Sequence, residues 1–275
     1  MTPLFVLKAN GQREPFDESK LRNSLIRAGA SEQNAEIIAT EVIGELGDET
    51  RTTEIYKKAF EHLHKMSVPA AKRYILKRAV MDLGPSGFPF EKFVAEILRR
   101  KGFEVKTDEM MLGECVEHEV DVVAWNQKDL LAIEAKFHNE LGVKSDLKVV
   151  LYVKARIDDL KGTTFNYGGH NRKVTEGWLV TNTKFTTTAI RYAECTNLKL
   201  LGWNYPEKEN LHDLIMETKT LPITCISQLT VAQKHELLNQ GIVFCDSLIE
   251  KTEVLKSLGI KDDKIEHILH EIKSL

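Results

Sequence analysis

Residues 119–136 read EVDVVAWNQKDLLAIEAK, and this stretch decides the fold of the segment around it. It contains two apolar runs joined by the polar turn 126–129. Short runs rich in Val, Leu and Ile on either side of a polar turn are typical of paired β-strands. We therefore predict two adjacent strands, with Asp121 on the first and Glu134 and Lys136 on the second.

Three charged side chains of this hairpin are candidates for chemistry. Glu134 and Lys136 are two residues apart and so share one face of their strand, and Asp121 can face the same side. Burying such charges is costly unless they are paired or bind a metal. Two carboxylates suit Mg²⁺ or Mn²⁺, which activates water and stabilises charge on a phosphodiester, while Lys136 would orient that water. The alternative is a pair of solvated strand acids beside an incidental lysine.

A helix is predicted over residues 89–101, just before the strands. Phe90, Phe93 and Ile97 recur at helical spacing and form an apolar stripe. Such a helix packs its stripe against the sheet. Glu91 lies beside the stripe, so we expect it to reach the carboxylate site.

The segment around the hairpin alternates strands with helices, which indicates a mixed α/β sheet covered on both faces. The expected strands are 103–105, 119–125, 130–136, 177–181 and 198–201, and the expected helices are 89–101, 144–160, 185–195 and 208–217. Breaks at Gly84-Pro85-Ser86-Gly87 and near Pro222 predict three domains, 1–85, 86–220 and 221–275.

The flanking segments are predicted to be mostly helical. The first opens with a hairpin at Asn10-Gly11, because Asn-Gly between extended runs favours a two-residue turn. Four helices are then expected to start at the capping residues Asp17, Ser31, Thr52 or Thr53, and Ser67. The third segment reads as helices over 230–239, 246–257 and 262–273.

The composition is that of an ordinary globular protein, with 275 residues, 42% hydrophobic and 29% charged. A net charge of −3, from 38 basic and 41 acidic residues, gives no bulk argument for nucleic-acid binding, so any such contact must come from a local stretch such as the basic 136–173. Four cysteines without a CxxC pair argue against a zinc site or a disulfide framework. No apolar run spans a membrane, and the N-terminal stretch becomes charged too early for a secretory signal, so we expect a cytoplasmic protein with no membrane partner.

Four stretches of the middle segment together resemble the Mrr-like branch of the PD-(D/E)xK restriction endonucleases. They are GFPFEKFVAEILRRKGFEV (87–105), HEVDVVAW (118–125), LLAIEAKFHN (130–139) and WLVTNTKFTTTAIRYAE (178–194). The resemblance implies a restriction-endonuclease-like α/β/α sandwich and a metal-dependent endonuclease acting on double-stranded DNA. It assigns metal binding to Glu91, Asp121 and Glu134, with Lys136 as a further catalytic residue. Many members carry Gln where this chain has Glu134.

The stretch VLKANGQREPFDESKLRNSLIRAG (6–29) resembles the ATP-cone, a nucleotide-binding regulatory domain. The resemblance implies ATP or dATP as a regulatory ligand and, because cones act by changing assembly, a homodimer or a nucleotide-dependent oligomer. The positions it assigns to the nucleotide are Val6, Lys8, Gly11, Arg13, Phe16, Lys20, Leu21, Thr53, Arg73, Lys77 and Arg78. The alternative is a solvated basic face. The chain has no G-x-x-x-x-G-K-[ST] motif, so ATP hydrolysis at a P-loop is not expected.

The sequence therefore favours a DNA endonuclease whose activity is tuned by an adenine nucleotide. Two alternatives stay open: a nucleotide-sensing DNA-binding protein that does not cut, and a structure-selective nuclease for junctions or flaps. The third segment loosely resembles helix-hairpin-helix modules, and a packed helical appendage or a dimerisation element fits its residues as well.

Overall fold

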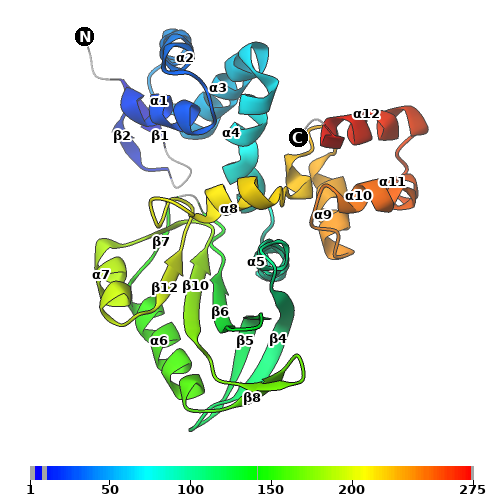
Figure 1. Cartoon of the computed structure of the whole chain (residues 1–275). Coiled ribbons are helices and arrows are strands. Elements are labelled where there is room, and N and C mark those ends of the chain that lie inside the picture. The colour runs from blue at the N-terminus through cyan, green and yellow to red at the C-terminus, as the bar shows by residue number, and fades with distance from the viewer. Residues whose placement is uncertain (1–3, 8–10, 141, 274–275) are drawn as a thin grey trace. The chain divides into compact units, whose positions relative to one another are not determined.

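The computed structural model describes residues 4–7, 11–140 and 142–273 (Figure 1). The chain divides into two compact units. One contains the chain up to Arg78 together with the residues from His270 on, and the other spans Ala79–Leu269. The expected mixed α/β class is confirmed.

The first unit opens with a small sheet in the order β2-β1-β3. Strands β1 (Phe5–Leu7) and β2 (Arg13–Pro15) are antiparallel, which confirms the expected hairpin, although Asn10 of its turn lies outside the described residues. Strand β3 (Thr50–Arg51) pairs parallel with β1 and was not predicted. Because β2 is an edge strand, it accommodates Pro15, which has no N–H to donate to a neighbour.

Four helices complete the first unit. They begin close to the predicted starts, although the N-cap of the third is Arg51, which makes no side-chain capping bond, and not Thr52 or Thr53. They are α1 (Glu18–Arg27), α2 (Glu32–Gly44), α3 (Thr52–Met66) and α4 (Val68–Met81), the last of which continues into the second unit. The Asp17 carboxylate accepts the N–H of Ser19 at 3.0 Å, and the Ser31 hydroxyl accepts that of Asn34 at 3.1 Å. These bonds satisfy amides that a helix start leaves without partners.

The second unit contains the larger sheet, with the strand order β12-β10-β6-β5-β4. Its strands are β4 (Glu104–Leu112), β5 (Glu117–Trp125), β6 (Leu130–Lys136), β10 (Glu176–Thr181) and β12 (Lys199–Leu201). Strands β4, β5 and β6 form an antiparallel meander, and β6, β10 and β12 are parallel. Strand β4 is much longer than the expected 103–105 because it pairs along the length of β5.

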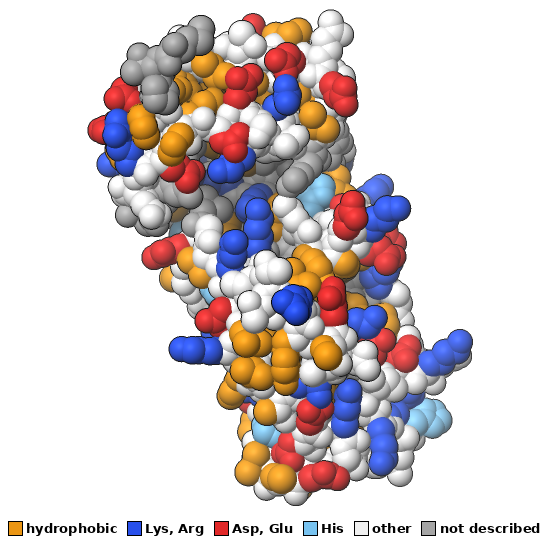
Figure 2. Space-filling view, turned by 90° about the vertical axis from the view of Figure 1, so that its left-hand side faces the viewer, with side chains coloured by type: hydrophobic (Ala, Val, Ile, Leu, Met, Phe, Trp, Pro, Cys, Tyr) orange, Lys and Arg blue, Asp and Glu red, His pale blue; other side chains and the backbone are white. Residues whose placement is uncertain are grey.

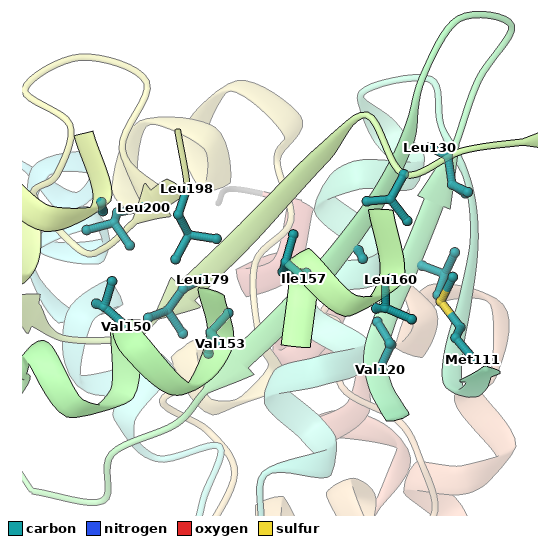
Figure 3. Close-up of a cluster of buried hydrophobic side chains, with 14 of the residues drawn as sticks. Met111, Val120, Leu130, Val150, Val153, Ile157, Leu160, Leu179, Leu198 and Leu200 are labelled. Atoms are coloured by element: carbon teal, nitrogen blue, oxygen red, sulfur yellow. The ribbon is translucent and has the colours of Figure 1, made fainter. Parts of the chain in front are cut away.

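Helices cover both faces of this sheet, as predicted. Helix α5 (Phe88–Arg100) packs on one face, and α6 (Leu147–Lys161) and α7 (Thr187–Cys195) pack on the other (Figure 1). Val150 and Val153 of α6 meet Leu179 of β10 in the core under α6 (Figure 3). Burial of these apolar side chains holds α6 against the strands.

Three expected helices, 144–160, 185–195 and 208–217, begin two or three residues later than predicted, and a hairpin was missed. Lys144–Ser145 (β7) and Lys184–Phe185 (β11) form a short parallel pair, after which Asp146 caps α6 and Thr186 caps α7. Strands β8 (Phe165–Tyr167) and β9 (His170–Arg172) form the missed hairpin. Its turn residues, Gly168 and Gly169, both have positive φ, which glycine adopts without strain.

The C-terminal part consists of short helices. They are α8 (Leu211–Thr218), the 3₁₀ turn η1 (Ile223–Cys225), α9 (Val231–Asn239), α10 (Ser247–Glu250), α11 (Thr252–Ser257) and α12 (Asp262–Lys273). The helix expected over 246–257 is wrong in one respect, because Lys251 leaves the helical conformation (φ −119°, ψ 46°) and separates α10 from α11. Arg100 of α5 ties this part to the sheet by donating to the Thr218 and Lys219 carbonyls, both at 3.2 Å, and to Asp246. Among the helices that the structure describes, none combines the length and apolar character needed to cross a membrane.

Candidate active site

The candidate site lies where β5 and β6 stop pairing. The register of the two strands ends at Val122↔Ile133. Beyond that pair, the Asp121 carboxylate accepts the main-chain N–H of Ala135, with 2.7 Å between Oδ2 and N. A side chain thus replaces a main-chain partner, and we call this place the strand opening.

Glu134 lies on β6 at the strand opening and points toward α6. Arg156 of α6 donates from Nη1 to Glu134 Oε2. Both side chains are largely buried, with exposed fractions of 14% for Arg156 and 19% for Glu134. Burial raises the pKa of Glu134 to about 7, helped by the charge of Asp121 and opposed by Arg156 and Lys136.

Asp121 lies at the centre of the acidic side chains. Burial raises the pKa of Asp121 above its usual value. The N–H of Ala135 and the charge of Arg156 lower that pKa, whereas the charges of Glu119 and Asp108 raise it. The charge of Arg156 and the N–H of Ala135 therefore offset only part of the effect of burial and of the neighbouring acids.

Glu91 approaches Asp121 from α5. Burial, together with the charges of Asp121 and Asp108, raises the pKa of Glu91 to about 7. Asp108 lies on β4 with a positive φ of 55°, a conformation that Asp tolerates better than most residues. The sequence patterns missed Asp108. The feature that could have identified it is an acidic residue in the middle of a long β-strand.

Lys136 is the last residue of β6, and its side chain is exposed. The chain after it is held by the buried Asn182. The His138 N–H donates to Asn182 Oδ1 at 2.8 Å, and Asn182 Nδ2 donates to the His138 carbonyl at 2.9 Å. These two bonds prolong the β6–β10 pairing and fix the direction of the chain beyond Lys136. Sequence reasoning gave Asn182 no role.

The donor set of the strand opening fits a hard divalent cation. Among the residues that the structure describes, no three acidic, histidine or cysteine side chains converge closely enough to hold a metal ion. The available donors are nonetheless carboxylate oxygens, which Mg²⁺ and Mn²⁺ prefer. Burial, the largest cause, and neighbouring carboxylates raise the pKa values of Asp121, Glu134 and Glu91, and a bound cation would stabilise the charged forms of these groups.

His118 does not join this site. Its Nε2 lies 2.7 Å from Asp159 Oδ2 on α6, and the Asp159 carboxylate also accepts the N–H of Cys115 and of Val116. Burial alone would raise the pKa of Asp159, but these hydrogen bonds outweigh it and lower that pKa to about 2. His118 therefore joins β5 to α6.

The basic stretch 136–173 does not form a uniform cationic surface. Lys154 pairs with Asp158 on α6, and Arg156 pairs with Glu134. On the face shown in Figure 2, lysines and arginines are interspersed with acids. Charge alone therefore marks no path for a nucleic acid on that face.

The first unit contains a hollow of about 180 Å³ that is mostly aromatic and apolar. Tyr56 and Tyr74 stack there with ring centroids 4.5 Å apart, and Ser24 donates to Tyr74 Oη at 3.4 Å. Burial raises the pKa of Tyr74 to about 12. The lining residues are Val6, Glu14, Phe16, Asp17, Lys20, Leu21, Thr52, Ile55, Tyr56 and Tyr74.

Four of the matched cone positions line this hollow: Val6, Phe16, Lys20 and Leu21. Arg13 instead pairs with Glu49 at 3.1 Å and stacks on Phe5. The other matched positions do not line it as far as the structure describes them: Gly11 lies in an exposed turn, Lys77 and Arg78 lie on α4, Lys8 is outside the described residues, and the side chains of Thr53 and Arg73 are not described. The sequence patterns missed Tyr56, although an aromatic residue on the third helix was visible.

Three family models match the chain in succession. The ATP cone domain matches residues 4–82, the restriction endonuclease domain matches residues 85–204, and the AF1548-like C-terminal domain matches residues 221–275. The expected order of an ATP-cone followed by an Mrr-type endonuclease domain is confirmed.

Two matches cover nearly the whole length of the protein compared. An uncharacterized protein of Archaeoglobus fulgidus is 38% identical over 184 residues, which are 66% of this chain and 99% of that protein. The crystal structure of AF1548, a protein of unknown function, is 36% identical with a TM-score of 0.55, covering 68% of this chain and 97% of that one.

Proposed function

Because the chain belongs to the AF1548-like family and carries an ATP-cone followed by a restriction-endonuclease domain, we propose that it is a divalent-metal-dependent DNA endonuclease regulated by ATP or dATP. The proposed functional units are residues 1–85, 86–220 and 221–275. Residues 86–220 would hydrolyse the phosphodiester bond of double-stranded DNA, and residues 1–85 would bind the nucleotide.

The observation that carries the nuclease proposal is the crowding of carboxylates at the strand opening. Burial and neighbouring acids raise the pKa values of Asp121, Glu134 and Glu91 together. Gathering largely buried acids is costly, and among the described ion pairs Arg156 pairs with Glu134 but not with Asp121 or Glu91, so such a cluster favours a functional explanation.

Each residue has a proposed role in the hydrolysis. Asp121, Glu134 and Glu91 would hold Mg²⁺ or Mn²⁺. When bound, the cation supplies charge stabilisation and a more acidic water. Lys136, exposed at the end of β6, would orient the attacking water and offset charge developing on the phosphate. Asn182 holds the chain that follows Lys136 and would thereby position it.

The regulatory proposal is supported by the hollow in the first unit. Stacked tyrosine rings offer a flat apolar surface of the kind that an adenine ring prefers, and the exposed Lys20 is a cation suited to a phosphate. Nucleotide binding would change the assembly of a homodimer or larger oligomer. Measurement of molecular mass in solution with and without ATP or dATP tests this part.

The test of the nuclease is a plasmid-cleavage assay with Mg²⁺ or Mn²⁺, with and without ATP. We expect metal-dependent cutting that falls by about 10³-fold or more in Asp121→Ala. The matched control is Glu117→Ala, which removes an exposed acid from the same strand. Equal cutting by wild type and Asp121→Ala would overturn the assignment.

A second candidate is a nucleotide-sensing DNA-binding protein that does not cut. The Arg156–Glu134 pair favours it, because an arginine there neutralises one of the proposed metal ligands. Retained DNA binding without any nick in Mg²⁺ or Mn²⁺ would support this reading. A junction or flap nuclease would instead cut branched substrates and leave the linear duplex intact.

A further inference from the structure

Arg156 occupies the strand opening itself. From α6, its Nη1 donates to Glu134 Oε2 on β6 and, at 2.9 Å, to the carbonyl of Glu119 on β5. Its Nη2 donates to Tyr152 Oη one turn earlier on α6. The guanidinium therefore bridges β5 and β6 where their pairing has ended, beside Asp121.

The groups that face this guanidinium are mostly acidic. The charge of Arg156 acts on both Asp121 and Glu134, and the charge of Glu119 acts on the same two carboxylates. A guanidinium is always charged in a protein, so Arg156 supplies a permanent positive charge at the strand opening. It thus performs electrostatically the task that a bound cation would perform.

The guanidinium is held incompletely. Arg156 Nε is buried and has no hydrogen-bond partner among the residues that the structure describes. A buried donor without a partner costs free energy, so this position of the arginine is less favourable than a fully bonded one. Tyr152, which holds Nη2, is an exposed side chain. The Nε, for which the structure describes no partner, makes the position of Arg156 beside Glu134 less stable, and the partner of Nη2, Tyr152, lies at the protein surface.

We propose that Arg156 is the resident counter-ion of the carboxylate site and that a divalent cation must displace it from Glu134 in order to bind. This inference rests on the proposed nuclease function. A resident arginine explains why the carboxylates influence one another electrostatically although no three of the described side chains lie close enough together to hold a metal ion. Arg156 would then be a gate on metal binding rather than a metal-binding residue.

The test is calorimetric titration of the metal-free full-length protein with Mn²⁺ at pH 8. Arg156→Met removes the competing charge but keeps a long side chain, and we expect Mn²⁺ to bind about 10-fold more tightly, which corresponds to about 1.4 kcal/mol. Tyr152→Phe removes one acceptor of the arginine at an exposed position, and we expect binding about 2–3-fold tighter. Circular dichroism checks that each variant is folded.

The matched control is Lys154→Met. Lys154 carries the same charge on the same helix but pairs with Asp158 instead of Glu134, so we expect its affinity to stay within about 2-fold of wild type. An equal gain of Mn²⁺ affinity in Lys154→Met would show that loss of any positive charge on α6 is sufficient, and it would overturn the proposed role of Arg156. Asp121→Ala is expected to abolish binding in every background.

The outcomes separate this inference from the nuclease proposal. If wild type binds Mn²⁺ through Asp121 while folded Arg156→Met and Tyr152→Phe bind no more tightly, the gate is wrong and the metal site stands. If Arg156→Met binds and wild type does not, the gate is supported. If neither binds, the proposed metal site fails and the gate fails with it.

Discussion

The strand opening and the hollow of the first unit are lined by side chains of different chemical character. The opening gathers carboxylates, a lysine and an arginine from three strands and two helices. The hollow is lined mostly by aromatic and aliphatic side chains, with Glu14, Asp17 and Lys20 among its polar residues. The first suits a compact hard cation, and the second suits a flat apolar ring. A sequence motif made of charged residues therefore identifies the residues of the strand opening better than those of the hollow.

The difference shows in where the named residues lie. Asp121, Glu134 and Glu91 share one electrostatic environment, because strand pairing and the packing of α5 bring them together. At the hollow, the basic Arg13 is turned away and paired with Glu49. The comparison predicts that charge substitutions matter most at the opening and ring substitutions matter most at the hollow.

After the loss already expected in Asp121→Ala, the largest effect is expected at Lys136. Lys136→Ala should reduce plasmid cleavage by about 10²–10³-fold without unfolding the protein, because it removes a charge placed to stabilise the transition state. Lys128→Ala, an exposed lysine in the turn before β6, is the matched control and should cut at the wild-type rate. A folded Lys136→Ala protein with normal activity would contradict the prediction that charge substitutions matter most at the strand opening.

A smaller effect is expected at Tyr56. Tyr56→Leu should weaken ATP binding by about 10-fold in an equilibrium fluorescence titration, because it removes a ring that stacks on Tyr74. Arg13→Ala should change the affinity by less than about 2-fold, since Arg13 is engaged in exposed ion pairs. The reverse ranking would show that charge, rather than the aromatic surface, determines nucleotide affinity.

The smallest effect is expected in the pH dependence of stability. A carboxyl group whose pKa is about 7 in the folded protein, as for Glu134, keeps its proton at pH values where the unfolded chain has released it. The free energy of unfolding of the metal-free protein should therefore fall as the pH rises from about 4.5 to 7. Thermal melts report this, at about 2–4 °C for each kcal/mol.

Two variations sharpen this measurement. Glu134→Gln cannot lose a proton, so its melting temperature should change less between pH 5 and pH 8 than that of wild type. Mn²⁺ should restore the melting temperature of wild type above pH 7 but not that of Asp121→Ala. A wild-type curve as flat as that of Glu134→Gln would mean that the acids at the strand opening carry no surplus charge.

Much of the fold was predictable because it depends on local signals. Asp17 and Ser31 cap their helices, and the apolar spacing in 89–101 predicts the buried face of α5. The starts of α6 and α7 were missed because β7 and β11 pair across a long sequence separation. The β8–β9 hairpin was missed because its strands are only three residues long, too short to show a clear period.

The sequence by itself determined the order of the ATP-cone and endonuclease domains, and it proposed Asp121, Glu134, Glu91 and Lys136 as site residues, because both follow from residue types and spacings along the chain. Only the tertiary structure decided that Arg156 faces Glu134, that Asp108 faces Glu91, and that Asn182 holds the chain beyond Lys136. These contacts join residues far apart in sequence, and packing of helices on a twisted sheet decides which side chains meet. The physical reason is that burial and neighbouring charge, which set the chemistry of a site, depend on distance in space and not on position in the chain.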